Sequence, residues 1–252
     1  MKLNFKKIGS GPPLVILHGL FGSADNWYSI SKEIDTEFTI YLIDQRNHGD
    51  SPHSDEWDYQ VMAEDLLEVL DEEGLEKVYL MGHSMGGKTA MTFAVNHPER
   101  VEKLIVADIS PRHYPVHHEL ILKGLQSIDL NKIKTRKEAD DALSQYIPEI
   151  GIRQFLLKNL ARTSEGFSWK INLPIIVEKI EEVGEELEED SKYKGPTLFL
   201  AGEKSDYIQQ KDLPSILAHF PEYDLITIPK AGHWLHAEQP KAVVEEIRRF
   251  LK

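Results

Sequence analysis

The chain of 252 residues contains no cysteine. This absence excludes a disulfide framework, a zinc site built on thiolates and a cysteine nucleophile. The sequence also has no apolar run that approaches the roughly 20 residues a membrane-spanning helix needs. Residues 1–7, MKLNFKK, are too polar for a secretory signal peptide. We therefore expect a cytoplasmic protein whose chemistry depends on oxygen and nitrogen side chains.

An excess of basic residues is missing as well. Lysine and arginine number 29 against 42 aspartates and glutamates, which gives a formal net charge of −13. Nucleic acids and anionic membranes are bound through basic patches, so both are disfavoured as partners. Hydrophobic residues make up 41% and charged residues 28%, as in ordinary globular enzymes. The length favours one large domain, with room for an inserted subdomain.

Short apolar runs alternate with stretches of helical spacing along the chain. Near-continuous apolar runs are typical of parallel strands that are covered on both faces. The expected strands are residues 14–17, 39–43, 78–81, 104–107, 197–201 and 225–228, with an extra, antiparallel one at 3–6. The expected helices are residues 62–70, 87–96, 213–220 and 242–250. This alternation predicts an α/β fold with a doubly wound, mostly parallel sheet.

The alternation breaks between residues 112 and 193, where the sequence shows helical segments and no convincing strand. Those segments lie at 119–125, 137–146, 152–160 and 175–187. We interpret residues 112–193 as a helical cap inserted in a core of residues 1–111 and 194–252. Ligands bind at the carboxyl ends of the strands in such sheets, so a cap there would cover the site. The run 178–190 holds eight acidic residues, and we expect an amphipathic helix with a solvated acidic face.

Gly82-His83-Ser84-Met85-Gly86 is the motif that carries most chemical information. It is a G-x-S-x-G pentapeptide between an expected strand and an expected helix. Such a turn holds the serine in a strained conformation with its hydroxyl exposed above the sheet. The flanking glycines are required because a Cβ at either position would collide with the neighbouring strand and helix. Ser84 is therefore the candidate nucleophile.

A serine hydroxyl needs a base to accept its proton. His233 is the best candidate, because it follows the expected strand at 225–228 and so lies at the same sheet edge as Ser84. His236 is a weaker one, since it falls where the last helices begin. The backbone N–H of Met85, at the start of a helix, and that of Leu20 are the expected oxyanion donors.

Two further polar loops follow strands at this edge of the sheet. Leu20 belongs to the loop His18-Gly19-Leu20-Phe21-Gly22, in which we expect His18 to anchor backbone rather than to react. The loop at 44–51 contains Arg46, for which we expect an ion pair that buttresses the turn.

The base in turn needs an acid that orients it. Asp108 and Asp206 both follow expected strands, and both lie between Ser84 and His233 in the sequence. Asp108 stands directly at a strand end. Asp206 lies four residues beyond Gly202, which ends the next strand.

Across nearly its whole length the chain resembles the α/β-hydrolase superfamily, whose order of nucleophile, acid and histidine it shares. The runs 82–88 (GHSMGGK), 108–111 (DISP), 46–49 (RNHG) and 232–237 (GHWLHA) resemble more narrowly the YbfF-type esterases. The resemblance implies a capped serine esterase whose acid follows the sixth strand, which matches Asp108. The usual superfamily acid stands three residues after the glycine that ends the seventh strand, and Ser205 occupies that position here. These observations favour Asp108 and keep Asp206 as the alternative.

The sequence thus predicts a serine hydrolase that cleaves small to medium acyl esters through a Ser-His-Asp triad and an acyl-enzyme. Thioesters are a further candidate substrate class. Its expected partner is the small-molecule substrate, and we expect neither a metal nor an organic cofactor. Carbon–carbon hydrolases, lyases and perhydrolases use the same scaffold, and a non-catalytic ligand receptor is a further alternative.

Overall fold

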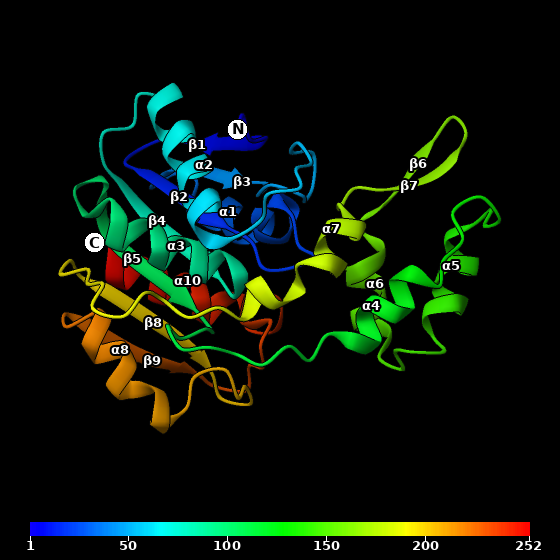
Figure 1. The fold of residues 1–252 in the computed structure, drawn as a ribbon. Coiled ribbons are helices and arrows are strands. Elements are labelled where there is room, and N and C mark those ends of the chain that lie inside the picture. The colour runs from blue at the N-terminus through cyan, green and yellow to red at the C-terminus, as the bar shows by residue number, and fades with distance from the viewer.

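The computed structural model, which describes residues 1–252, is built on a seven-stranded sheet with the strand order β1-β3-β2-β4-β5-β8-β9 (Figure 1). Only β1 runs antiparallel to its neighbour, β3. The strands are β1 (Phe5–Gly9), β2 (Pro13–Leu17), β3 (Thr39–Ile43), β4 (Val78–His83), β5 (Val101–Ala107), β8 (Thr197–Gly202) and β9 (Tyr223–Ile228). All seven strands expected from the sequence are present, and the fold class is confirmed.

Helices cover both faces of the sheet, which is why the central strands are apolar on both sides. All six residues of β8, for example, are buried. One face packs against α2 (Tyr59–Glu72), α3 (Met85–Asn96) and α8 (Leu213–His219). The other face packs against α1 (Tyr28–Ile34) and α10 (Pro240–Leu251). Short helices η1 (Ala24–Trp27), η2 (Pro98–Arg100), η4 (Gln210–Asp212) and α9 (Leu235–Glu238) lie in the connections.

The chain between β5 and β8 forms a separate layer beside the sheet (Figure 1). It contains α4 (Glu119–Gln126), α5 (Arg136–Leu143), α6 (Ile150–Leu157), β6 (Leu160–Thr163), β7 (Gly166–Trp169), α7 (Leu173–Glu178) and η3 (Ile180–Gly184). We refer to this layer as the cap. Its buried apolar residues form one cluster with core side chains that include Trp57, Met62 and Met85. Its outer limits at residues 112 and 193 stay a prediction.

Two parts of the cap differ from the sequence expectation. Residues 160–169 form the antiparallel hairpin β6–β7, in a region for which no strand was expected. Helix α7 ends at Glu178 and is followed by η3, so the expected amphipathic helix to residue 187 is wrong. Tyr114 donates its backbone N–H to the Gly184 carbonyl at 2.8 Å. This pairing, together with repulsion among closely spaced glutamates, competes with a continued helix.

The cap is joined to the core by a first linker, residues 108–118 between β5 and α4, and by a second linker, residues 185–196 between η3 and β8. Lys88 binds both linkers to the core. The side chain lies on α3, is only 1% exposed, and follows Ser84 by one helical turn. Its ammonium donates to the backbone carbonyls of Pro111 at 3.0 Å and Arg112 at 2.6 Å on the first linker. It also donates to the Glu185 carbonyl at 2.6 Å on the second linker. One buried lysine side chain therefore contacts both connections of the cap.

No helix of the structure combines the length and the apolar character that a membrane crossing requires.

Candidate active site

Ser84 lies in the tight turn between β4 and α3. Its backbone angles are φ 53° and ψ −119°, a region that side-chain-bearing residues rarely adopt. A Cβ added to Gly82 would collide with the Gly86 backbone, and one added to Gly86 would lie 2.5 Å from the Leu17 carbonyl oxygen. The glycines of the motif are thus required by the close approach of strand and helix, as the sequence predicts.

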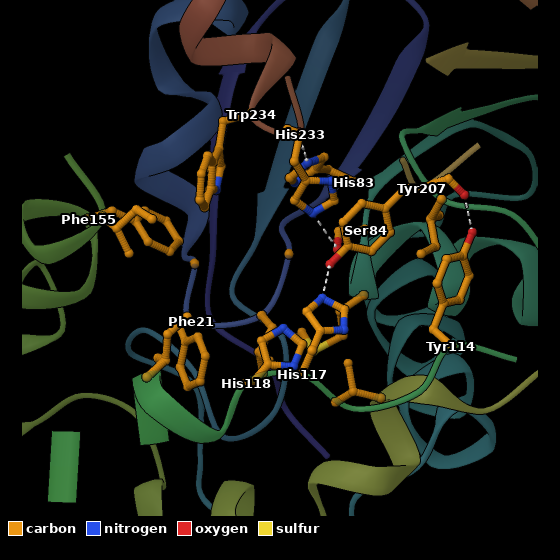
Figure 2. A pocket seen from close by; sticks show the side chains of 18 of the residues that line it. Phe21, His83, Ser84, Tyr114, His117, His118, Phe155, Tyr207, His233 and Trp234 are labelled. Atoms are coloured by element: carbon orange, nitrogen blue, oxygen red, sulfur yellow. Dashed lines mark hydrogen bonds between the residues drawn. The ribbon is translucent and has the colours of Figure 1, made fainter. Parts of the chain in front are cut away.

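His233 is positioned by the loop between β9 and α9. Its Nε2 lies 3.0 Å from Ser84 Oγ, which is hydrogen-bond distance for a base and a nucleophile. Figure 2 shows the imidazole directed at the serine from above the pocket. The side chain remains about one fifth exposed (19%).

The carboxylate beneath His233 belongs to Asp108, directly after β5. Asp108 Oδ2 lies 2.8 Å from His233 Nδ1, and Asp108 itself is fully buried. Its other oxygen, Oδ1, accepts a hydrogen bond from the Gly202 N–H at 2.8 Å. Asp206, the alternative acid, is exposed and accepts a long hydrogen bond of 3.3 Å from Gln209. The structure therefore brings Asp108, and not Asp206, to the histidine.

Ser205 occupies the position at which the superfamily's usual acid stands. Its hydroxyl donates to Asp108 Oδ2, the oxygen that also contacts His233. The loop after β8 thus supports an acid that comes from the neighbouring strand β5. Two donors to Oδ2 and one to Oδ1 satisfy the hydrogen-bonding capacity of this buried carboxylate.

Of the other histidines near the triad, His18, His83 and His236 belong to the core and make no hydrogen bond to Ser84. His18 pairs its Nδ1 with the Gly19 carbonyl at 2.8 Å and accepts from the Gln45 N–H at 3.0 Å, so it anchors backbone as expected. His83 holds the His233 carbonyl at 2.8 Å. His236 stacks on Trp27, with 4.5 Å between ring centroids. Burial lowers the pKa of His83 well below its ordinary value and that of His236 to about 4, so both are neutral at pH 7.

The expected oxyanion donors, Leu20 and Met85, both line the pocket above Ser84. Neither backbone N–H is paired with a protein acceptor. The Gly22 N–H donates to the Gly19 carbonyl at 2.9 Å across the intervening turn, with Phe21 at φ 58°. This turn presents the Leu20 peptide at the pocket, opposite the start of α3.

Arg46 does not reach the pocket. It forms a buried ion pair with Asp65, with Nε–Oδ2 at 2.6 Å, and donates to the Glu56 carbonyl at 2.7 Å. This is the buttressing role that the sequence predicts for it.

The cavity at Ser84 has a volume of about 230 Å³. Aspartate, glutamate, lysine and arginine are all absent from its lining. On the cap side it is lined by Val116, Ile121, Ile152, Phe155, Leu156 and Val183. Among the large apolar side chains of the cap, Phe155 and Leu156 on α6 line this wall. Phe167 and Trp169 lie on β7, where they pack within the cap.

Sequence reasoning missed Ser205, His83 and Tyr207 as neighbours of the triad. The one-residue displacement of Asp206 from the usual acid position was a signal for Ser205. No signal in a single sequence identified Tyr207, whose ring stacks on His233 with centroids 4.0 Å apart.

Comparison with known proteins places the chain among related hydrolases. A family model described as alpha/beta hydrolase fold matches residues 12–240. The sn-1-specific diacylglycerol lipase ABHD11 of Danio rerio is 41% identical, over 97% of this chain and 80% of the relative. Esterase YbfF of Escherichia coli is 35% identical, over 100% of this chain and 99% of the relative. A solved marine microorganism esterase is 50% identical, with a TM-score of 0.97 and 99% of both chains covered.

Proposed function

Because the chain belongs to the α/β-hydrolase family, we propose that it is a serine hydrolase acting on small to medium carboxylic esters. The observation that carries the proposal is the continuous set of contacts from Asp108 through His233 to Ser84, which opens into the cavity. Relatives named as esterases and lipases support the same class.

In the proposed reaction, Ser84 Oγ attacks the acyl carbonyl while His233 Nε2 accepts its proton. Asp108 fixes the histidine tautomer and stabilises the imidazolium. The N–H groups of Leu20 and Met85 donate to the oxyanion. His233 then protonates the leaving alcohol, and water releases the acid from the acyl-enzyme by the same steps. The uncharged, largely apolar wall favours neutral acyl chains.

The test is the variant Ser84→Ala with a panel of p-nitrophenyl esters from acetate to octanoate. We expect kcat to fall on the order of 10⁶-fold, with an unchanged circular dichroism spectrum. Ser191→Ala, outside the pocket, is the matched control. A folded Ser84→Ala protein that retains a tenth of the activity or more would exclude Ser84 as the nucleophile.

Thioesters are a second substrate class on the same residues. Butyryl-CoA and an uncharged S-alkyl thiobutyrate, assayed beside the butyrate ester, separate thioesterase from esterase activity. A fluorophosphonate that labels Ser84 in the wild-type protein distinguishes an enzyme from a non-catalytic receptor.

A further inference from the structure

Tyr207 is an aromatic neighbour of the triad that the proposed reaction does not use. It lies in the loop after β8, and its ring is nearly parallel to that of His233, with an interplanar angle of 18°. Figure 2 shows Tyr207 beside His233, on the side of the pocket opposite Trp234 and Phe155.

The stacked ring restrains a motion that the triad hydrogen bonds leave open. Contacts at Nδ1 and Nε2 of His233 define a line through the imidazole, and the ring can rock about that line. A flat ring against one face opposes this rocking. The face of an aromatic ring also attracts a cation, and His233 gains a positive charge when it accepts the proton of Ser84. The contact therefore acts on the transition state more than on substrate binding.

Tyr207 is itself held by the first linker of the cap. Its hydroxyl lies 3.1 Å from His117 Nε2, and its backbone carbonyl accepts a hydrogen bond from the Tyr114 hydroxyl. His117 Nδ1 lies 2.9 Å from the Pro115 carbonyl and therefore carries the hydrogen. This leaves Nε2 as the acceptor for the Tyr207 hydroxyl. Burial raises the pKa of Tyr207, which keeps that hydroxyl protonated.

We propose that Tyr207 is a positioning residue for His233, and that it couples the first linker of the cap to the orientation of the imidazole. The proposal rests on the proposed function, in which His233 is the base. Tyr207 touches neither Ser84 nor the acid through a side-chain hydrogen bond, so it acts through the histidine.

Tyr207→Leu and Tyr207→Phe separate the ring from the hydroxyl. With p-nitrophenyl acetate we expect Tyr207→Leu to lose about tenfold or more in kcat while KM changes less than about twofold. Tyr207→Phe should lose only about threefold in kcat. The rate of labelling by a small fluorophosphonate should fall in parallel with kcat. This rate depends on the activation of the Ser84 hydroxyl and not on binding of an acyl chain in the pocket. Tyr223→Leu, on β9 away from the site, is the matched control.

The coupling to the cap is tested by a double-mutant cycle of Tyr207→Phe and His117→Ala. We expect about threefold loss of kcat in each single variant and no further loss in the double variant. Additive losses, or no loss in either single variant, would overturn the link to the cap. The cycle also keeps the proposal testable if Tyr207→Leu does not fold.

Two outcomes distinguish this inference from the proposed function. If Ser84→Ala is inactive and folded Tyr207→Leu keeps wild-type kcat, the role of Tyr207 is overturned and the proposed function stands. If Ser84→Ala remains active, the proposed function itself fails. A rise in KM alone in Tyr207→Leu would make Tyr207 a substrate contact and also overturn the positioning role.

Discussion

The core and the cap contribute different kinds of side chains to the same cavity. On the core side, Asp108, His233 and Ser84 are fixed by directional contacts of 2.8–3.0 Å and by a backbone turn that only glycine flanks permit. On the cap side, the wall consists of apolar side chains from α4, α6, η3 and the connection before α4. The cap joins the core through apolar packing, through the carbonyls that Lys88 binds, and through polar contacts such as Asn159 to the Phe21 carbonyl and Lys170 to Asp50, both at 2.7 Å.

This difference separates the tasks of the two regions. Proton transfer tolerates little displacement, so the groups proposed to perform it sit on strand ends within a close-packed core. Apolar contacts are less directional, and a wall made of them can change shape with modest loss. Changes in the core should therefore alter the rate on every substrate, whereas changes in the cap wall should alter the choice among substrates.

Among the variants that keep Ser84, the largest expected effect is that of Asp108→Asn. The Asn oxygen can still accept the hydrogen bond from the Gly202 N–H, so the amide NH₂ then faces His233 Nδ1. A donor at that position favours the histidine tautomer that carries its hydrogen on Nε2, which cannot accept the proton of Ser84. We expect kcat to fall by about 10⁴, as it does when the triad aspartate of a serine protease is replaced by asparagine. Steady-state kinetics on a short ester measure the loss.

Asp206→Asn is the matched control for Asp108→Asn, because it changes an exposed carboxylate directly before Tyr207, the residue that stacks on His233. It should lose less than about tenfold in kcat. A severe loss in Asp206→Asn alone would reverse the assignment of the acid. Comparable losses in both variants would mean that two acids share His233.

Acidification should destabilise the core through its buried neutral histidines. Burial lowers the pKa of His48 to about 3 and that of His236 to about 4, whereas an unfolded histidine titrates near ~6.5. As the pH falls below about 6.5, these histidines bind protons in the unfolded chain but not in the folded chain. The free energy of unfolding therefore decreases. At pH 5 these two residues together lower it by roughly 4 kcal/mol.

Urea unfolding at pH 7.5 and pH 5 measures this decrease. His236→Gln should reduce the pH slope by about one proton, whereas His53→Gln, at an exposed position, should leave the slope unchanged. Equal stability at the two pH values would show that these histidines are not held neutral.

Lys88→Met tests the junction between the two regions. It removes the donor to three backbone carbonyls, and we expect a loss of roughly 3 kcal/mol in the free energy of unfolding. Limited proteolysis should cut the two linkers faster than in the wild type. Lys103→Met is the control, because Lys103 donates to a single carbonyl, that of Phe250, at 2.7 Å. Equal linker cleavage in the two variants would refute the role of Lys88 as the attachment of the cap.

The sequence predicted the core far better than the cap, and for a physical reason. Buried parallel strands are read directly from continuous apolar runs, and a G-x-S-x-G turn has few structural solutions. The cap consists of short elements whose ends depend on tertiary partners, such as Gly184 pairing with Tyr114. The residues of the site show the same difference. Ser84 and His233 were predictable because they follow strand ends, whereas Tyr207 reaches His233 through the conformation of the loop after β8, which the hydrophobic periodicity of the sequence does not predict.

The smallest expected effect is a change in selectivity at Phe155, on the cap side of the cavity. Its ring lies 6.0 Å from that of Trp234, so the two rings line the same part of the wall from opposite regions. Phe155→Trp adds volume there, and we expect activity on octanoate to fall about fivefold relative to acetate. The ratio of kcat/KM values for the two esters measures this change.

Phe167→Trp, in the cap but outside the lining of the cavity, should leave that ratio unchanged. A uniform loss on both esters in Phe155→Trp would mean that the side chain holds the cap together, and the separation between a core that sets rate and a cap that sets choice would fail at this position.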